Sequence, residues 1–198
     1  LHGAGKGKDL IDINDLGMDK LEICGDKLCI GARCTLQDLA ESDLVPDFIR
    51  EAARFCSSFV KRNAATVGGN LALRRDDSYM AAALAAADAA LECMCIQGPK
   101  EKKIAEYLQS DCLALIMNIK IDKDRSGWAK RFGKTAASHA AVTAAQSGDF
   151  YALSVHGSGF ACGNSPEIAE SLTYTDDMTG SAEYKKYLAK TVFTLRRQ

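Results

Sequence analysis

The residues best suited to binding chemistry lie in one short segment, Ala65-Thr66-Val67-Gly68-Gly69-Asn70. Adjacent glycines allow a backbone to adopt positive φ, and they leave no side chain between the main chain and a ligand. Amide groups exposed in this way can hold a pyrophosphate. Thr66 and Asn70 add a hydroxyl group and a side-chain amide on either side of the glycines. The segment therefore predicts a phosphate-binding loop. A simple tight turn is the alternative that a Gly-Gly pair alone favours.

Helical patterns on both sides are expected to position this loop. Pro46 favours the start of a helix, and the apolar residues that follow it recur at helical spacing. After the loop, Ser78 leads into an alanine-rich run at residues 80–89. We expect this run to form a helix that can lie close to a bound cofactor or to a neighbouring strand.

The rest of the chain alternates strand-like and helix-like segments. Gly25-Asp26 joins two short apolar segments as in a β-hairpin, and Thr35 followed by Asp38 predicts the N-cap of a short helix. A charged turn at residues 122–125 separates a mixed first part from a strand-rich second part. This order predicts an α/β (α+β) protein with two units, residues 1–125 and 126–198. Further strands are expected at residues 91–96, 113–121, 128–132, 140–145 and 150–155, and a closing helix is expected to bury Tyr184, Leu188, Val192 and Leu195 on one face.

The composition argues against some classes of binding partner. The 198 residues carry a formal net charge of -1, with 25 basic and 26 acidic residues, so a nucleic-acid or anionic-membrane surface is not expected. No apolar run approaches the roughly 18 residues of a membrane-spanning helix. The 8 cysteines indicate reduced thiols of a cytoplasmic protein rather than a disulfide scaffold. Cys24, Cys29 and Cys34 do not complete an iron–sulfur pattern, and no metal site is predicted.

Residues 65–70 resemble the A-T-V-G-G-N signature of the flavin-binding (medium) subunit of the molybdenum hydroxylases, the family of xanthine dehydrogenase and carbon monoxide dehydrogenase. Three further segments are similar to family blocks and come in the family's order: Leu10-Ile11-Asp12-Ile13, residues 30–39 and residues 180–185. The resemblance covers most of the chain. It implies the flavin-binding domain of these flavoproteins, with a strand at Leu10-Ile11-Asp12-Ile13, followed by a smaller C-terminal α+β domain.

The resemblance also implies FAD as the cofactor. Its pyrophosphate would lie between residues 65–70 and a first glycine loop at His2-Gly3-Ala4-Gly5, where Ala4 interrupts the family's glycine pair. On composition alone, that stretch is equally a glycine-rich chain end. Tyr79 stands where the family usually has Asp, which leaves that contact open. Asp76 or Asp77 is the candidate to replace it, and solvated acids of a polar loop are the alternative. The resemblance assigns these residues to the cofactor site: Gly3, Ala4, Gly5, Ala65, Thr66, Gly68, Gly69, Asn70, Ser78, Leu115, Ile116 and Lys130.

Some of these residues have a second interpretation. Leu115 and Ile116 match strand residues near the adenine or the flavin ring, and a plain core position is the alternative. Lys130 matches a lysine that faces the pyrimidine edge of the flavin, where a cation favours the reduced, anionic form; a solvated surface lysine is the alternative. His139 and His156 lie in segments without a carboxylate or cysteine pattern, so no catalytic residue is assigned. A flavin subunit needs none, because the isoalloxazine performs the redox chemistry.

By this resemblance the protein is the FAD-binding electron-transfer subunit of an oxidoreductase similar to xanthine dehydrogenase. A large partner subunit would bind molybdopterin, and a small one would carry [2Fe-2S] clusters whose electrons pass through FAD to NAD⁺ or another acceptor. Two alternatives stay open: a flavin-free scaffold for subunit assembly, motivated by Ala4 and Tyr79, and a stand-alone flavin oxidase. The family's subunits are longer, so further residues are expected before Leu1 and between Gly5 and Lys6.

Overall fold

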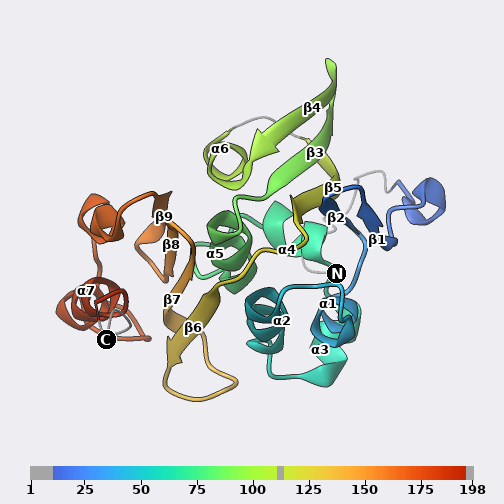
Figure 1. Cartoon of the computed structure of the whole chain (residues 1–198). Coiled ribbons are helices and arrows are strands. Elements are labelled where there is room, and N and C mark those ends of the chain that lie inside the picture. The colour runs from blue at the N-terminus through green and yellow to red at the C-terminus, as the bar shows by residue number, and fades with distance from the viewer. Residues whose placement is uncertain (1–10, 111–113, 195–198) are drawn as a thin grey trace.

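The computed structural model describes residues 11–110 and 114–194 of the chain. Its strands form two antiparallel sheets, and helix α5 (Tyr79–Ala86) lies between them in the view of Figure 1. The α/β (α+β) class expected from the sequence is confirmed.

The first sheet contains five strands in the order β1-β2-β5-β3-β4. Strands β1 and β2 form the expected hairpin, and its turn places Gly25 at φ +69°. In β2, Leu28 and Ile30 are fully buried, whereas Lys27 and Cys29, which alternate with them, are only partly buried. This is the pattern of a strand with one face on the core. The strands are β1 (Leu21–Cys24), β2 (Lys27–Gly31), β3 (Ala90–Cys95), β4 (Gly98–Lys103) and β5 (Leu115–Asp122).

The second sheet packs against the alanine-rich helix. It has the order β6-β7-β8-β9, and α5 contacts β7 and β8 most extensively. Every residue of α5 after Tyr79 is buried, and the Ser154 hydroxyl of β8 donates a hydrogen bond of 2.7 Å to the Ser78 carbonyl. Small side chains on both elements allow this close approach, so the expected contact with a neighbouring strand is confirmed. The strands are β6 (Trp128–Gly133), β7 (Ala140–Ser147), β8 (Phe150–Val155) and β9 (Gly159–Gly163).

Hydroxyl side chains cap the N-termini of most of the helices. Thr35 and Asp38 form the expected capping box at the start of α1, with both reciprocal hydrogen bonds present. Ser58, Thr66 and Ser78 cap three later helices in the same way, through a side-chain oxygen that accepts a backbone N–H. Among the residues described, no helix is long and apolar enough to cross a membrane. The other helices are α1 (Leu36–Glu41), α2 (Asp47–Arg54), α3 (Phe59–Ala64), α4 (Val67–Ala72), α6 (Ile104–Gln109) and α7 (Ala182–Thr191).

Some elements differ from the sequence-based expectation. Residues 11–13 form no strand, and a single 3-10 turn, Asn14–Leu16, follows them. Strand β4 was not expected, because charged residues dominate it and give no apolar alternation. Lysines are typical of edge strands, where they discourage pairing with another chain. Helix α6, strand β9 and the 3-10 helix Pro166–Ser171 were also not expected.

Helix α7 buries only part of the expected face: Val192 is buried and Leu188 is partly buried, while Leu195 lies outside the described residues. Tyr184 is 48% exposed, whereas Lys185 is fully buried. The ammonium group of Lys185 contacts the carbonyl oxygens of His156 at 2.7 Å and Thr175 at 3.0 Å, and it forms an ion pair with Asp177. Its three N–H donors therefore each have an acceptor, which permits a charge in the interior. The sequence could not predict the burial of Lys185, because the loops before α7 and after β8 place these acceptors and the helical pattern does not specify them.

Replacement of this lysine tests its structural role. We expect Lys185→Ala to lower the free energy of unfolding by about 3–5 kcal/mol, because it leaves the Asp177 carboxylate without its buried counter-charge. Urea denaturation measures the change. Lys186→Ala, one residue away and exposed, is the matched control and should change the value by less than about 0.5 kcal/mol. Equal effects of the two substitutions would contradict a specific role for Lys185.

The same ion pair makes the stability depend on pH. Burial raises the pKa of Asp177, but hydrogen bonds from Lys185, Thr179 and His156 outweigh this effect and hold the pKa well below its usual value. The carboxylate therefore stabilises the fold at pH values above the unfolded Asp pKa of about 3.9, and this contribution is lost as the pH falls. We expect an Asp177→Asn variant to be less stable at pH 7 and to lose less stability between pH 6 and pH 3 than the parent. Urea denaturation across this pH range checks both effects, and parallel curves for the two proteins would contradict the assignment.

Candidate functional site

The glycine segment is the start of a helix rather than a loop. Thr66 has extended backbone angles and pairs with Thr35 in an isolated antiparallel bridge, and α4 begins at the next residue. Gly68 and Gly69 therefore occupy the first turn of α4, and neither has positive φ. The expectation of a left-handed backbone here is wrong.

The glycines instead allow close packing. A Cβ atom on Gly68 would lie 2.6 Å from the Cβ of Ala32 and 2.8 Å from its carbonyl oxygen, so no larger residue fits without movement. A Cβ atom on Gly69 would lie 2.8 Å from the side-chain oxygen of Thr66. The first turn of α4 can therefore pack directly against the backbone of Ala32, which follows β2.

The first backbone amides of α4 already have partners. The N–H groups of Val67 and Gly68 donate to the carbonyls of Cys34 and Ala32, each at 2.9 Å. Those of Gly69 and Asn70 donate to the hydroxyl and carbonyl of Thr66. The donors that remain for a ligand are side chains rather than the backbone amides that the sequence suggested.

Thr66 and Asn70 are oriented to supply such donors. The Thr66 oxygen accepts the Gly69 N–H at 3.1 Å, so its own hydrogen can be donated outward. The Asn70 carbonyl oxygen accepts a hydrogen bond of 2.8 Å from the Ser78 hydroxyl, which leaves its NH₂ group to donate. Ser78 in turn caps α5 by accepting the Ala81 N–H. The two helix caps thus hold the two neutral donors in place.

Two cavities border α4. The apolar cavity, of about 240 Å³, lies against Thr66, Gly68 and Gly69 and is closed mainly by aliphatic side chains. The polar cavity, of about 230 Å³, lies against Asn70 and Ser78 and contains charged groups. The residues around the apolar cavity also include Ile13, Met18, Ala32, Ala72, Leu115 and Ile116, and those around the polar cavity include Phe55, Lys61, Arg75, Asp77, Tyr79, Arg131 and His139.

An aromatic pair forms one wall of the polar cavity. The rings of Phe55 and Tyr79 meet edge to face, with centroids 6.3 Å apart. Burial and a hydrogen bond with Cys56 raise the pKa of Tyr79 well above its usual value, so the phenol is neutral at pH 7. Tyr79 therefore presents a neutral aromatic surface to the polar cavity.

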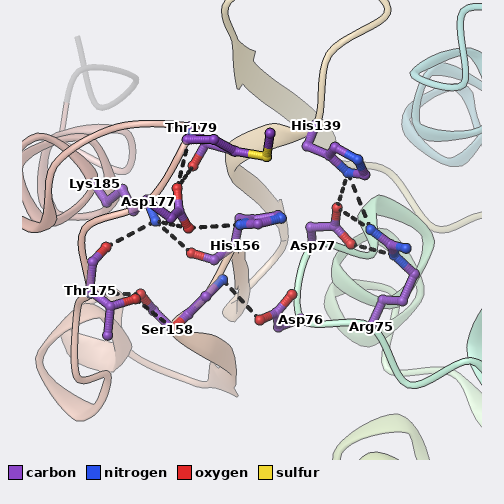
Figure 2. Close-up of polar contacts among 12 residues, drawn as sticks. Arg75, Asp76, Asp77, His139, His156, Ser158, Thr175, Asp177, Thr179 and Lys185 are labelled. Carbon is purple, nitrogen blue, oxygen red and sulfur yellow. Dashed lines mark hydrogen bonds and ion pairs between the residues drawn. The ribbon is translucent and has the colours of Figure 1, made fainter.

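An acid–base cluster lies at the edge of the same cavity (Figure 2). Arg75 binds both oxygens of Asp77, at 2.7 and 2.9 Å, and His139 Nδ1 lies 2.8 Å from Asp77 Oδ2. Burial raises the pKa of Asp77, but the hydrogen bonds from Arg75 and His139 outweigh it and lower the pKa below its usual value. Sequence reasoning missed this cluster because Asp77 and His139 are 62 residues apart and belong to no local motif.

The other sequence-predicted site residues fall into four groups. Leu115 and Ile116 both border the apolar cavity, the first partly exposed and the second buried. Lys130 is exposed on β6, with its ammonium group 5.3 Å from the centre of the Phe132 ring, while its neighbour Arg131 borders the polar cavity. Ala65 is half-buried just before Thr66. Gly3, Ala4 and Gly5 lie outside the described residues.

Sequence comparison gives a family and a relative. Residues 4–121 match the family described as the FAD binding domain in molybdopterin dehydrogenase. The uncharacterized protein YgfM of Escherichia coli K12 is 30% identical over 200 residues, which cover 91% of this chain and 76% of YgfM.

Solved structures share the fold. Quinoline 2-oxidoreductase from Pseudomonas putida 86 superposes with a TM-score of 0.73 at 16% identity, over 88% of this chain and 75% of that one. Carbon monoxide dehydrogenase from Hydrogenophaga pseudoflava gives 0.72 at 18% identity, with the same coverage of 88% and 75%. The reconstituted enzyme from Oligotropha carboxidovorans gives 0.71 at 20% identity, over 91% and 76%.

Adding one methyl group at position 68 tests the role of Gly68 in packing. In an exposed helix, Gly→Ala is stabilising by up to about 1 kcal/mol. Here we expect Gly68→Ala to destabilise the protein by about 1–3 kcal/mol, because the new Cβ overlaps Ala32. Gly69→Ala should cost less, since the Thr66 side chain that it meets can rotate. Thermal or urea unfolding measures both, and a Gly68→Ala variant as stable as the parent would contradict the close contact.

Proposed function

Since the chain belongs to the family of FAD-binding domains of molybdopterin dehydrogenases, we propose that it is the FAD-binding electron-transfer subunit of a molybdenum hydroxylase. FAD is the cofactor of this family. One observation carries the proposal for the present chain: the signature residues at the start of α4 border both an apolar and a polar cavity.

The residues around α4 fit an extended dinucleotide. FAD consists of two ring systems joined through a pyrophosphate, and the paired cavities offer each ring system its own site. Thr66 borders one cavity and Asn70 the other, and each keeps a hydrogen-bond donor that no other described residue accepts. We propose that these two donors bind the central part of FAD, which would cross the first turn of α4.

The charge of the polar cavity supports the same proposal. Lys61, Arg75 and Arg131 border it, against the single carboxylate of Asp77 among the residues named there. A pyrophosphate carries negative charge, and hydrogen bonds from cations to phosphate are stronger than those between neutral groups. We propose that Gly3, Ala4 and Gly5 also contact the pyrophosphate.

Bound FAD would supply the redox chemistry, so the chain's own task is to bind and shield it. The aliphatic side chains of Leu115 and Ile116 would exclude water from one ring system, and Phe55 and Tyr79 would pack beside the other. Lys130 is proposed to face the flavin, which requires its side chain to leave the Phe132 ring.

The wider assembly is part of the proposal. Electrons would arrive from [2Fe-2S] clusters of a small partner subunit, after substrate oxidation on a molybdopterin-binding large subunit, and would leave to NAD⁺ or another acceptor in the cytoplasm. Support comes from the shared fold with subunits of carbon monoxide dehydrogenase and quinoline 2-oxidoreductase. We further propose a flavin-binding domain at residues 1–125 and a C-terminal domain at residues 126–198.

Titration of the purified, flavin-free protein with FAD tests the site. We expect Asn70→Ala to weaken FAD binding by about tenfold or more, because it removes a hydrogen bond to a charged group. Asn63→Ala is the matched control: Asn63 is exposed on α3 and bonds only within its own helix, to the Phe59 carbonyl, among the described residues. Quenching of flavin fluorescence measures both affinities.

Position 66 tests the hydroxyl group that caps α4 and is proposed to bind FAD. Thr66→Ser keeps the hydroxyl group and should retain FAD affinity, whereas Thr66→Ala should lose affinity together with the cap. A parent protein that takes up no FAD would favour the flavin-free scaffold. FAD reduction and oxidation by a single-chain preparation acting on its own substrate would favour the stand-alone oxidase.

A further inference from the structure

We propose that Asp77, His139 and His156 form a binding site for one divalent transition-metal ion of the zinc class. A ligand atom from each residue lies within 4.8 Å of the other two. Asp77 comes from the loop between α4 and α5, His139 immediately precedes β7, and His156 immediately follows β8. The proposal does not depend on FAD binding, since no part of it uses the flavin.

His156 has the orientation of a metal ligand. Its Nδ1 donates a hydrogen bond of 2.7 Å to Asp177 Oδ2, which fixes the tautomer and leaves a lone pair on Nε2. Figure 2 shows the imidazole pointing away from Asp177 and toward Asp77. Asp177 is itself held by Lys185 and Thr179. A carboxylate behind a histidine ring in this way is the usual second layer of a metal site, because it orients the ring and raises its basicity.

Asp77 and His139 supply the other two donors. Asp77 is buried, with 8% of its surface exposed, and its Oδ2 lies 2.8 Å from His139 Nδ1. Two atoms at this separation can both bind a single ion at the roughly 2.0–2.2 Å typical of zinc. The mixture of imidazole and carboxylate donors favours zinc-class ions over Mg²⁺ or Ca²⁺, which prefer oxygen alone.

A bound cation must displace one of the contacts that Arg75 makes with Asp77. Its Nη2 lies 2.9 Å from Asp77 Oδ2 and 3.2 Å from His139 Nδ1. His139 Nδ1 cannot donate to Asp77 and accept from Arg75 with the same orbital, so one of these contacts is not a hydrogen bond. Arg75 also binds Asp77 Oδ1 through Nε at 2.7 Å, and its side chain is 48% exposed. The guanidinium can therefore pivot about its Nε hydrogen bond to Oδ1, which moves Nη2 away from Oδ2.

Two carboxylates supply the negative charge at this point. Asp77 belongs to the cluster, and Asp177, behind His156, forms an ion pair with Lys185. The polar cavity adjoins Asp77 and His139, which gives water access as a fourth ligand. A bound ion would link the loop after α4 to the start of β7 and the end of β8.

Titration with cobalt(II) chloride after chelator treatment tests the proposal on the flavin-free protein. Nitrogen- and oxygen-bound Co²⁺ gives visible absorption bands, and thiolate-bound Co²⁺ adds intense near-ultraviolet bands, which separates this site from the chain's cysteines. We expect one Co²⁺ per chain without thiolate bands, displaced by Zn²⁺. His139→Ala and His156→Ala should each weaken binding by tenfold or more.

Asp76→Asn is the matched control. Asp76 is adjacent to the cluster and accepts the Gly157 N–H at 2.8 Å, a contact that Asn can keep, so binding should be unchanged. His139 has a half-exposed side chain, and its removal should leave the fold intact by circular dichroism. Absence of visible bands in the parent, thiolate bands at one equivalent, or equal affinity in folded His139→Ala would each overturn the proposal.

Discussion

The candidate site depends on one close contact, between the first turn of α4 and the backbone at Ala32. Gly68 permits it, because a side chain there would overlap Ala32. The contact allows the Gly68 amide to donate to the Ala32 carbonyl, while the Ala32 amide donates to the carbonyl of Met117 in β5. Helix α4 is thereby fixed to the first sheet, and Thr66 and Asn70 are fixed with it. A dinucleotide site needs donors held this firmly, since a cofactor bound by mobile side chains would lose affinity in ordering them.

The second sheet is joined to this site through α5 and a few buried polar groups. The alanine side chains of α5 let β7 and β8 approach closely, and the Ser154–Ser78 hydrogen bond links β8 to the cap of α5. Ser78 also positions Asn70. The polar cavity therefore has walls from both parts of the chain, with Asn70 and Tyr79 on one side and Arg131 and His139 on the other. A change in β8 can reach the proposed cofactor site through this chain of contacts.

The sequence predicted what local pattern controls. The capping box at Thr35, the hairpin at Gly25 and the alanine-rich helix follow from neighbouring residues, and all are confirmed. The positive φ expected for the glycine pair is wrong, because the need for glycine comes from Ala32 and not from φ, and its role in phosphate binding stays a prediction. Buried Lys185 and the pairing of Asp77 with His139 could not be predicted, since Lys185 bonds loop groups that no helical pattern specifies and His139 is 62 residues from Asp77.

A crystal structure of the protein grown with saturating FAD would test the central claim most directly, namely that the start of α4 binds the middle of a dinucleotide. The account predicts one FAD per chain that crosses the first turn of α4, with Thr66 and Asn70 within hydrogen-bond distance and one ring system in each cavity. An FAD bound away from α4, or both cavities free of flavin at saturation, would contradict it.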